Sequence, residues 1–87
     1  MRHSTLRQLE VFEPIARLGS FTRAAEELFL TQPTVSMQIK KLTEAVGLPL
    51  FERTSRRVAL SRAGERLLID ARDVLRAVDR FDTAAAE

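Results

Sequence analysis

The segment from Ser20 to Gly47 constrains the fold most, because it holds two short amphipathic patterns with only three residues between them. The first pattern predicts a helix over residues 21–28, since its apolar residues fall at positions i, i+3, i+4 and i+7 of one stripe. These residues are Phe21, Ala24, Ala25 and Leu28. The alanine pair allows another helix to approach closely, where larger side chains would hold it away.

The second pattern predicts a helix over residues 32–46. Thr31 is a suitable N-cap, and Pro33 in the first turn removes no hydrogen bond that a helix needs. Gly47 then ends the helix. The apolar stripe of this helix consists of Val35, Ile39, Leu42 and Val46.

The opposite face of this second helix is polar and basic, with no carboxylate before Glu44. It consists of Gln32, Pro33, Thr34, Ser36, Met37, Lys40 and Lys41. A merely solvated helix surface usually mixes both signs of charge. A face that contacts DNA instead excludes negative charge and offers amide, hydroxyl and ammonium groups that reach the groove. The face therefore favours DNA binding over simple solvation.

A further helix is expected before this pair, from about Thr5 to Leu18, followed by Gly19 as a left-handed stop and Ser20 as the next N-cap. Pro14 interrupts the pattern, because proline within a helix loses one hydrogen bond and clashes with the preceding turn. We expect either a kink at Pro14 or a helix that starts late.

Beyond the second pattern, two brief candidate strands over residues 51–53 and 58–60 surround a polar loop. So short a hairpin is stable only when it packs on helices. The sequence thus predicts a mainly α winged helix-turn-helix with a two-stranded wing. Between positions 53 and 66 the chain carries five arginines, opposed only by Glu65, and they are Arg53, Arg56, Arg57, Arg62 and Arg66. Such a cluster either docks on phosphates or forms a solvated basic loop.

The last expected element is a long C-terminal linker helix that begins after Ser61 as N-cap. Its apolar stripe consists of Leu67, Ala71, Val74, Val78, Phe81 and Ala85, widened by Leu68 and Leu75. So long an apolar stripe exceeds what a small domain can cover, which predicts a homodimer through the same helix of a second copy. The expected dimer contacts are Leu68, Ala71, Leu75 and Val78; the alternative is that the helix folds back as core. We therefore divide the chain into a DNA-binding domain, 1–60, and a linker and dimerisation helix, 61–87.

The composition argues against an enzyme. There is no cysteine, and the single histidine, His3, lies near a chain end where a general base is poorly placed. No metal-ligand cluster is evident, so neither a metal nor a cofactor is expected. No signal-peptide core or membrane-length apolar run occurs, which predicts a cytoplasmic protein without a membrane partner. A helical protein-interaction module remains an alternative, but that function does not require the carboxylate-free face of the helix expected over residues 32–46.

Two stretches carry a family resemblance: SFTRAAEELFLTQPTVSMQIKKL, which begins at Ser20, and LPLFERTSRRVALSRAG, which begins at Leu48. Both resemble the N-terminal domain of LysR-type transcriptional regulators. The alanine pair, the Thr-Gln-Pro helix start, the Leu-Phe-Glu-Arg strand and the Ala-Gly of the last helix occur together at the family's spacing. The opening TLRQLEVFEPIARLGSFTRAAEEL and the stretch VSMQIKKL also resemble the branch that controls carbon dioxide fixation operons in autotrophic bacteria.

The resemblance implies a regulator that binds inverted repeats in double-stranded DNA near promoters, as a dimer or tetramer, and that recruits or obstructs RNA polymerase. It implies that an effector domain follows this one. The base-reading positions that it implies are Gln32, Pro33, Thr34, Ser36 and Met37. Gln32 suits an adenine edge, and Pro33 or Thr34 a thymine methyl group. Met37 replaces an arginine or other polar residue of many relatives, which puts a guanine contact in doubt and leaves an apolar contact as the alternative.

The same resemblance implies contacts to the DNA backbone or minor groove from two further places. The residues concerned are Lys40, Lys41, Arg53, Thr54 and Arg56. The lysines resemble phosphate or groove-edge groups, and the three wing residues resemble those that reach the backbone or minor groove.

Overall fold

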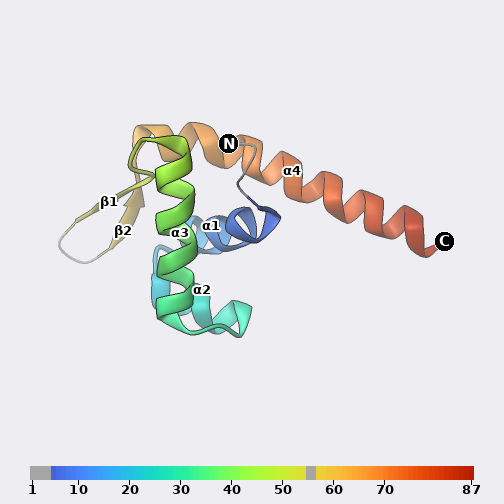
Figure 1. Cartoon of the computed structure of the whole chain (residues 1–87), viewed down its shortest axis with the longest axis horizontal. Coiled ribbons are helices and arrows are strands. Elements are labelled where there is room, and N and C mark those ends of the chain that lie inside the picture. Colours follow the sequence, from blue (N-terminus) through green and yellow to red (C-terminus); the bar gives the residue numbers. More distant parts are fainter. Residues whose placement is uncertain (1–4, 55–56) are drawn as a thin grey trace.

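The computed structural model describes residues 5–54 and 57–87, without the side chain of Arg53. It shows the expected mainly α architecture with a two-stranded antiparallel wing (Figure 1). The elements are α1 (Leu6–Leu18), α2 (Phe21–Leu28), α3 (Gln32–Val46), β1 (Phe51–Arg53), β2 (Val58–Leu60) and α4 (Arg62–Ala86). In the wing, Phe51 pairs with Leu60 and Arg53 with Val58.

Helix ends follow the predicted caps. The side-chain oxygen of Ser20 accepts a hydrogen bond from the backbone N–H of Arg23 at 3.1 Å, which begins α2. Gly19 and Gly47 end α1 and α3 with φ values of 66° and 83°, a left-handed conformation that costs glycine little. Phe29 ends α2 in the same conformation, at φ 57°, although it is not a glycine, and its side chain is 95% exposed.

Pro14 lies inside α1, which begins at Leu6. The expectation of a late helix start is therefore wrong. Pro14 is buried, and so are its neighbours Phe12 and Ile15. Packing of this face against the rest of the domain offsets the hydrogen bond that proline cannot donate.

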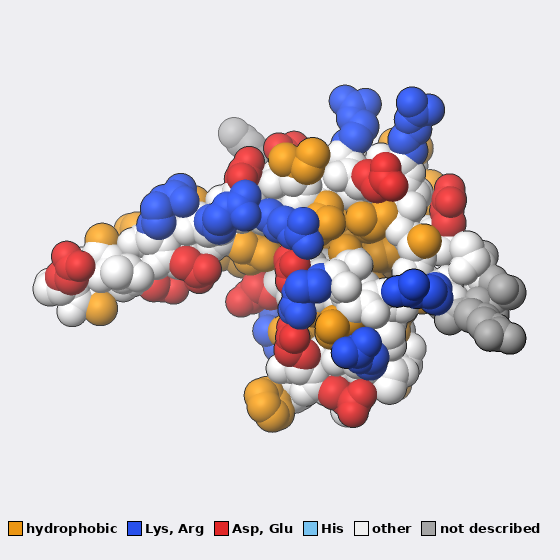
Figure 2. Space-filling model, turned by 180° about the vertical axis from the view of Figure 1, so that it is seen from behind, with side chains coloured by type: hydrophobic (Ala, Val, Ile, Leu, Met, Phe, Trp, Pro, Cys, Tyr) orange, Lys and Arg blue, Asp and Glu red, His pale blue; other side chains and the backbone are white. Residues whose placement is uncertain are grey.

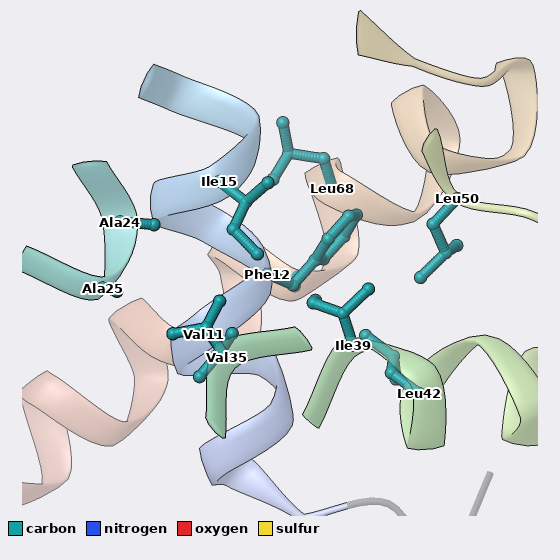
Figure 3. Close-up of a cluster of buried hydrophobic side chains, with 11 residues drawn as sticks. Val11, Phe12, Ile15, Ala24, Ala25, Val35, Ile39, Leu42, Leu50 and Leu68 are labelled. Atoms are coloured by element: carbon teal, nitrogen blue, oxygen red, sulfur yellow. The ribbon is translucent and has the colours of Figure 1, made fainter. Parts of the chain in front are cut away.

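The core lies where α1 crosses α2, α3 and the start of α4. Phe12 is at its centre, with Ile15 and Leu68 on one side and Ile39 and Leu42 on the other (Figure 3). The Phe12 and Phe21 rings both meet the Phe51 ring edge-on, with centroids 5.6 and 5.8 Å apart. These contacts attach the short wing to the helices and account for its stability.

The first turns of α4 belong to the same core. Gly64 lies so close to β1 that a Cβ atom there would be 2.1 Å from the carbonyl oxygen of Leu50. Leu68 and Ala71 are buried against α1. Both were expected as dimer contacts, and their burial within the domain leaves them little area for a partner, but their part in a dimer stays a prediction. The core thus includes residues on both sides of position 60, and the division of the chain expected there stays a prediction.

Beyond Ala71, α4 leaves the body as an arm, which gives the molecule a longest extent of 47 Å (Figure 1). Leu75 and Val78 on this arm are half-buried, and Phe81 is 73% exposed. No helix within the described ranges has a stretch long and apolar enough to cross a membrane.

Candidate nucleic-acid interface

The first turn of α3 lies at the end of the domain that is farthest from α4 (Figure 1). The Thr31 hydroxyl accepts a hydrogen bond from the backbone N–H of Thr34 at 3.3 Å and contacts the Thr34 hydroxyl at 2.8 Å. Pro33 is exposed within this turn. The cap therefore fixes the start of α3. The hydroxyl group of the half-buried Thr34 is already hydrogen-bonded to Thr31.

Gln32 and Ser36 are paired on the face expected to contact DNA. The Gln32 Nε2 donates to the Ser36 Oγ at 3.0 Å, across one helical turn. Gln32 is exposed and Ser36 half-buried. The contact orders a long side chain before any ligand binds, while Oε1 and the second N–H of Gln32 have no protein partner among residues 5–54 and 57–87.

Further along α3, Met37 is 47% exposed, and Lys40 and Lys41 are exposed as well. Neither lysine forms an ion pair with the described part of the chain. The buried stripe faces the other way, with Val35 fully covered and Ile39 at 6% exposure. The structure thus brings the predicted α3 residues together on one open, carboxylate-free surface.

The wing is closed by Thr54. Its backbone N–H and its hydroxyl both donate to the carbonyl oxygen of Arg57, at 3.1 and 3.0 Å. The backbone N–H of Val58 donates to the carbonyl oxygen of Gly19, which holds the hairpin against the start of α2. Thr54 is exposed, but its hydroxyl proton is used within the turn. Arg56 lies outside the described residues, and of Arg53 only the backbone is described.

Ion pairs connect three helices in a cluster that we call the Glu13 cluster, made of Glu13, Arg17, Glu27 and Arg72. Glu13 on α1 accepts hydrogen bonds from Arg72 of α4 at 3.3 Å and from Arg17 at 3.2 Å. Arg17 also donates to Glu27 of α2. This bond lowers the pKa of the Glu27 carboxyl below its ordinary value, and the bonds to Glu27 and Glu13 raise the pKa of Arg17.

Figure 2 shows a face on which basic and acidic side chains alternate, from the base of the arm down over the body. No sequence pattern points to the Glu13 cluster, because Glu13 and Arg72 are 59 positions apart. Within the described ranges, no group of three histidine, cysteine, aspartate or glutamate side chains is placed to hold a metal ion.

Comparison with known proteins decides the family. Residues 6–65 match the model for bacterial regulatory helix-turn-helix proteins of the lysR family. The chain belongs to this family. The match extends from the start of α1 into the first turn of α4, and so includes the wing and the whole exposed face of α3.

Curated relatives agree. The chain is 49% identical to the HTH-type transcriptional activator CmpR of a Synechocystis strain, over 87 residues that are 100% of this chain and 29% of that protein. It is 47% identical to the RuBisCO operon transcriptional regulator of Acidithiobacillus ferrooxidans, over 93% of this chain and 26% of the relative. The chain therefore spans less than a third of the length of these relatives.

Solved structures share the fold. The BenM DNA-binding domain in complex with catB site 1 DNA has a TM-score of 0.90 and 35% identity, covering 94% of this chain and 92% of that one. A Corynebacterium glutamicum OxyR mutant has a TM-score of 0.93 and 37% identity, covering 97% of this chain and 27% of that one. Full-length CbnR complexed with its target DNA has a TM-score of 0.86 and 33% identity, covering 94% of this chain and 28% of that one.

Proposed function

We propose that this chain binds double-stranded DNA in a sequence-specific manner, with α3 in the major groove, as the DNA-binding domain of a LysR-type transcriptional regulator. The observation that carries this proposal is the open face of α3, which has no carboxylate before Glu44 and no internal ion pair on its lysines. The major groove is wide enough to admit an α-helix. The BenM and CbnR structures, both complexes with DNA, support it.

The reading residues lie in the first turns of α3. Gln32 has a free Oε1 and a free N–H, the combination that pairs with N6 and N7 of an adenine. Pro33 and the exposed Met37 offer apolar surface to a thymine methyl group. Ser36 orients Gln32, and Thr34 contributes through its backbone and methyl group. A binding role of this kind requires no cofactor and no catalytic group.

Phosphate contacts come from flanking positions. Lys40 and Lys41 lie about one turn beyond Met37, the last of the reading residues, where ammonium groups reach the edge of the groove. From the wing, Arg53, Thr54 and Arg56 are proposed to contact the backbone or the minor groove. Each neutralised phosphate releases condensed counterions, so this part of the affinity depends strongly on salt.

The arm is the proposed contact with a second copy of the chain. An apolar cavity of about 70 Å³ between α1, α3 and α4 is lined in part by Leu67 and Val74, and it continues the uncovered stripe of α4. We propose that the same helix of a partner chain covers Leu75 and Val78, so that two α3 helices meet an inverted repeat. The full-length protein is then a dimer or tetramer that acts on RNA polymerase at promoters. The similarity to the RuBisCO operon transcriptional regulator of Acidithiobacillus ferrooxidans suggests carbon dioxide fixation genes as targets.

The test begins with DNA fragments selected from a random pool, which define a preferred site. Gln32→Ala is expected to weaken binding to that site by about 1–3 kcal/mol, or about 5- to 150-fold, and to affect random DNA little. Gln38→Ala is the matched control, because it makes the same change on the same helix at a half-buried position outside the reading face. Equal losses on selected and random DNA would refute base reading by Gln32.

A further inference from the structure

Beyond its first three turns, α4 is attached to the body by few contacts. Leu68 and Ala71 are the last residues of α4 in the core. The next residue, Arg72, makes the ion pair with Glu13, whose side chain is only 19% exposed. Further along, Arg76 pairs with Asp73 of α4 itself, at 2.6 Å. Among the described residues, the Arg72–Glu13 contact is thus the last ion pair between the arm and the body.

Glu13 is itself held in place from the other side. Arg17, one turn further along α1, donates to Glu13 and also to Glu27 on α2. The Glu13 carboxylate is therefore bound by side chains of α1 and α4, and Arg17 links it to α2. Because α2 packs directly on α3, the cluster connects the arm to the helix pair that carries the reading face.

Small changes at this contact become large at the end of the arm. Residues 72–86 of α4 extend about 22 Å at 1.5 Å per residue. A rotation of 10° at Arg72 moves the far end by about 4 Å, close to the rise of about 3.4 Å per base pair of DNA. In a dimer joined through the arms, the angle between arm and body therefore decides how far apart the two α3 helices lie.

We propose that Arg72 is a positioning residue: its contact with Glu13 sets the direction of the arm and thereby the half-site spacing that the dimer accepts. This inference rests on the dimeric DNA binding proposed above. It concerns the geometry of the dimer and not the contact of either α3 helix with its own half-site. Loss of the contact is expected to change spacing preference while leaving the affinity for one half-site unchanged.

The experiment uses duplexes that carry two copies of the selected half-site, with the spacer varied one base pair at a time, and a duplex with a single half-site. The Kd of each duplex is measured for the wild-type chain, Arg72→Gln, Glu13→Ala and Arg76→Gln. Arg76→Gln is the matched control, because it removes the same charge from the same helix but breaks only a contact within α4. Circular dichroism at the assay temperature verifies that each variant is folded.

We expect Arg72→Gln and Glu13→Ala either to move the preferred spacer by at least one base pair or to reduce discrimination between neighbouring spacers at least threefold. Arg76→Gln should keep the wild-type profile. Unchanged spacing in Arg72→Gln overturns the inference. So does an unchanged profile in Glu13→Ala, because Arg72 would then act on DNA directly, or an equal change in Arg76→Gln. A wild-type chain that binds without spacing preference refutes the dimer geometry, and one that binds no DNA refutes the proposed function itself.

Discussion

The helices α3 and α4 carry similar apolar stripes but differ in what covers them. In α3 the stripe is buried at Val35, Ile39 and Leu42, and only the opposite, polar face is open. In α4 the stripe is buried only as far as Ala71; beyond it Leu75 and Val78 are half-buried, and Val74 and Phe81 are exposed. Periodicity identifies the apolar face of a helix in both cases, but the amount of neighbouring structure decides whether that face becomes core or interface.

This difference explains how one small domain can offer the two interaction surfaces proposed above. The polar face of α3 is free because its apolar face is fully used within the domain. The arm of α4 retains apolar surface because the domain ends before it can cover 25 helical residues. The predictions below test whether the two halves of α4 behave as differently as their burial implies.

The largest effect is expected in the first turns of α4, whose apolar stripe is buried like that of α3. Leu42→Ala in α3 and Leu68→Ala in α4 should each reduce the free energy of unfolding by about 2–4 kcal/mol, because both side chains are buried and leave a cavity. Urea unfolding followed by circular dichroism measures both changes. Ile69→Ala is the control, since the Ile69 side chain is an isomer of that of Leu68 but is 64% exposed. This substitution should reduce the free energy of unfolding by less than about 0.5 kcal/mol.

A Leu68→Ala variant as stable as Ile69→Ala would contradict the view that the first turns of α4 are core in the same way as the stripe of α3. It would mean that the first turns of α4 contribute little to the core and that the domain ends nearer to Ser61. A loss similar to that of Leu42→Ala would instead extend the domain to Ala71.

The next effect concerns the outer half of α4. Leu75→Asp should leave the helix content unchanged and weaken self-association at least tenfold, about 1.4 kcal/mol, because a carboxylate would have to be buried between two arms. Sedimentation velocity over a range of concentrations measures the shift toward monomer. Asp79→Asn on the same arm changes charge at an exposed position and serves as the control. If Leu75→Asp sediments as the wild-type chain does, Leu75 does not contribute to a dimer.

Much of this architecture could be predicted from local sequence. The bounds of α2, α3 and both strands follow from short-range periodicity and from caps such as Thr31 and Ser61, whose effects extend over only three or four residues. The exposed polar face of α3 could be predicted for the same reason, because the open face of a helix is fixed once its buried stripe is known.

Long-range contacts could not be predicted in this way. The cover over Leu68 and Ala71 and the ion pair between Glu13 and Arg72 depend on how distant helices pack, and no residue spacing encodes that. Two local rules were also overridden. Pro14 is accepted inside α1 because its face is buried, and Phe29 adopts the left-handed conformation that glycine or asparagine normally signals.

The smallest effect compares the starts of the two helices. Ser61 accepts a hydrogen bond from the N–H of Gly64 at 3.0 Å and donates to the carbonyl oxygen of Pro49 at 2.6 Å, whereas the Thr31 cap is exposed. Ser61→Ala should cost about 1–2 kcal/mol, because it leaves the buried N–H of Gly64 and the part-buried carbonyl oxygen of Pro49 without their partner, and Thr31→Ala about 0.5–1 kcal/mol. Urea unfolding of both variants measures the difference. Equal costs would show that burial at the base of α4 adds nothing to its cap, which would weaken the view that this end of α4 is core.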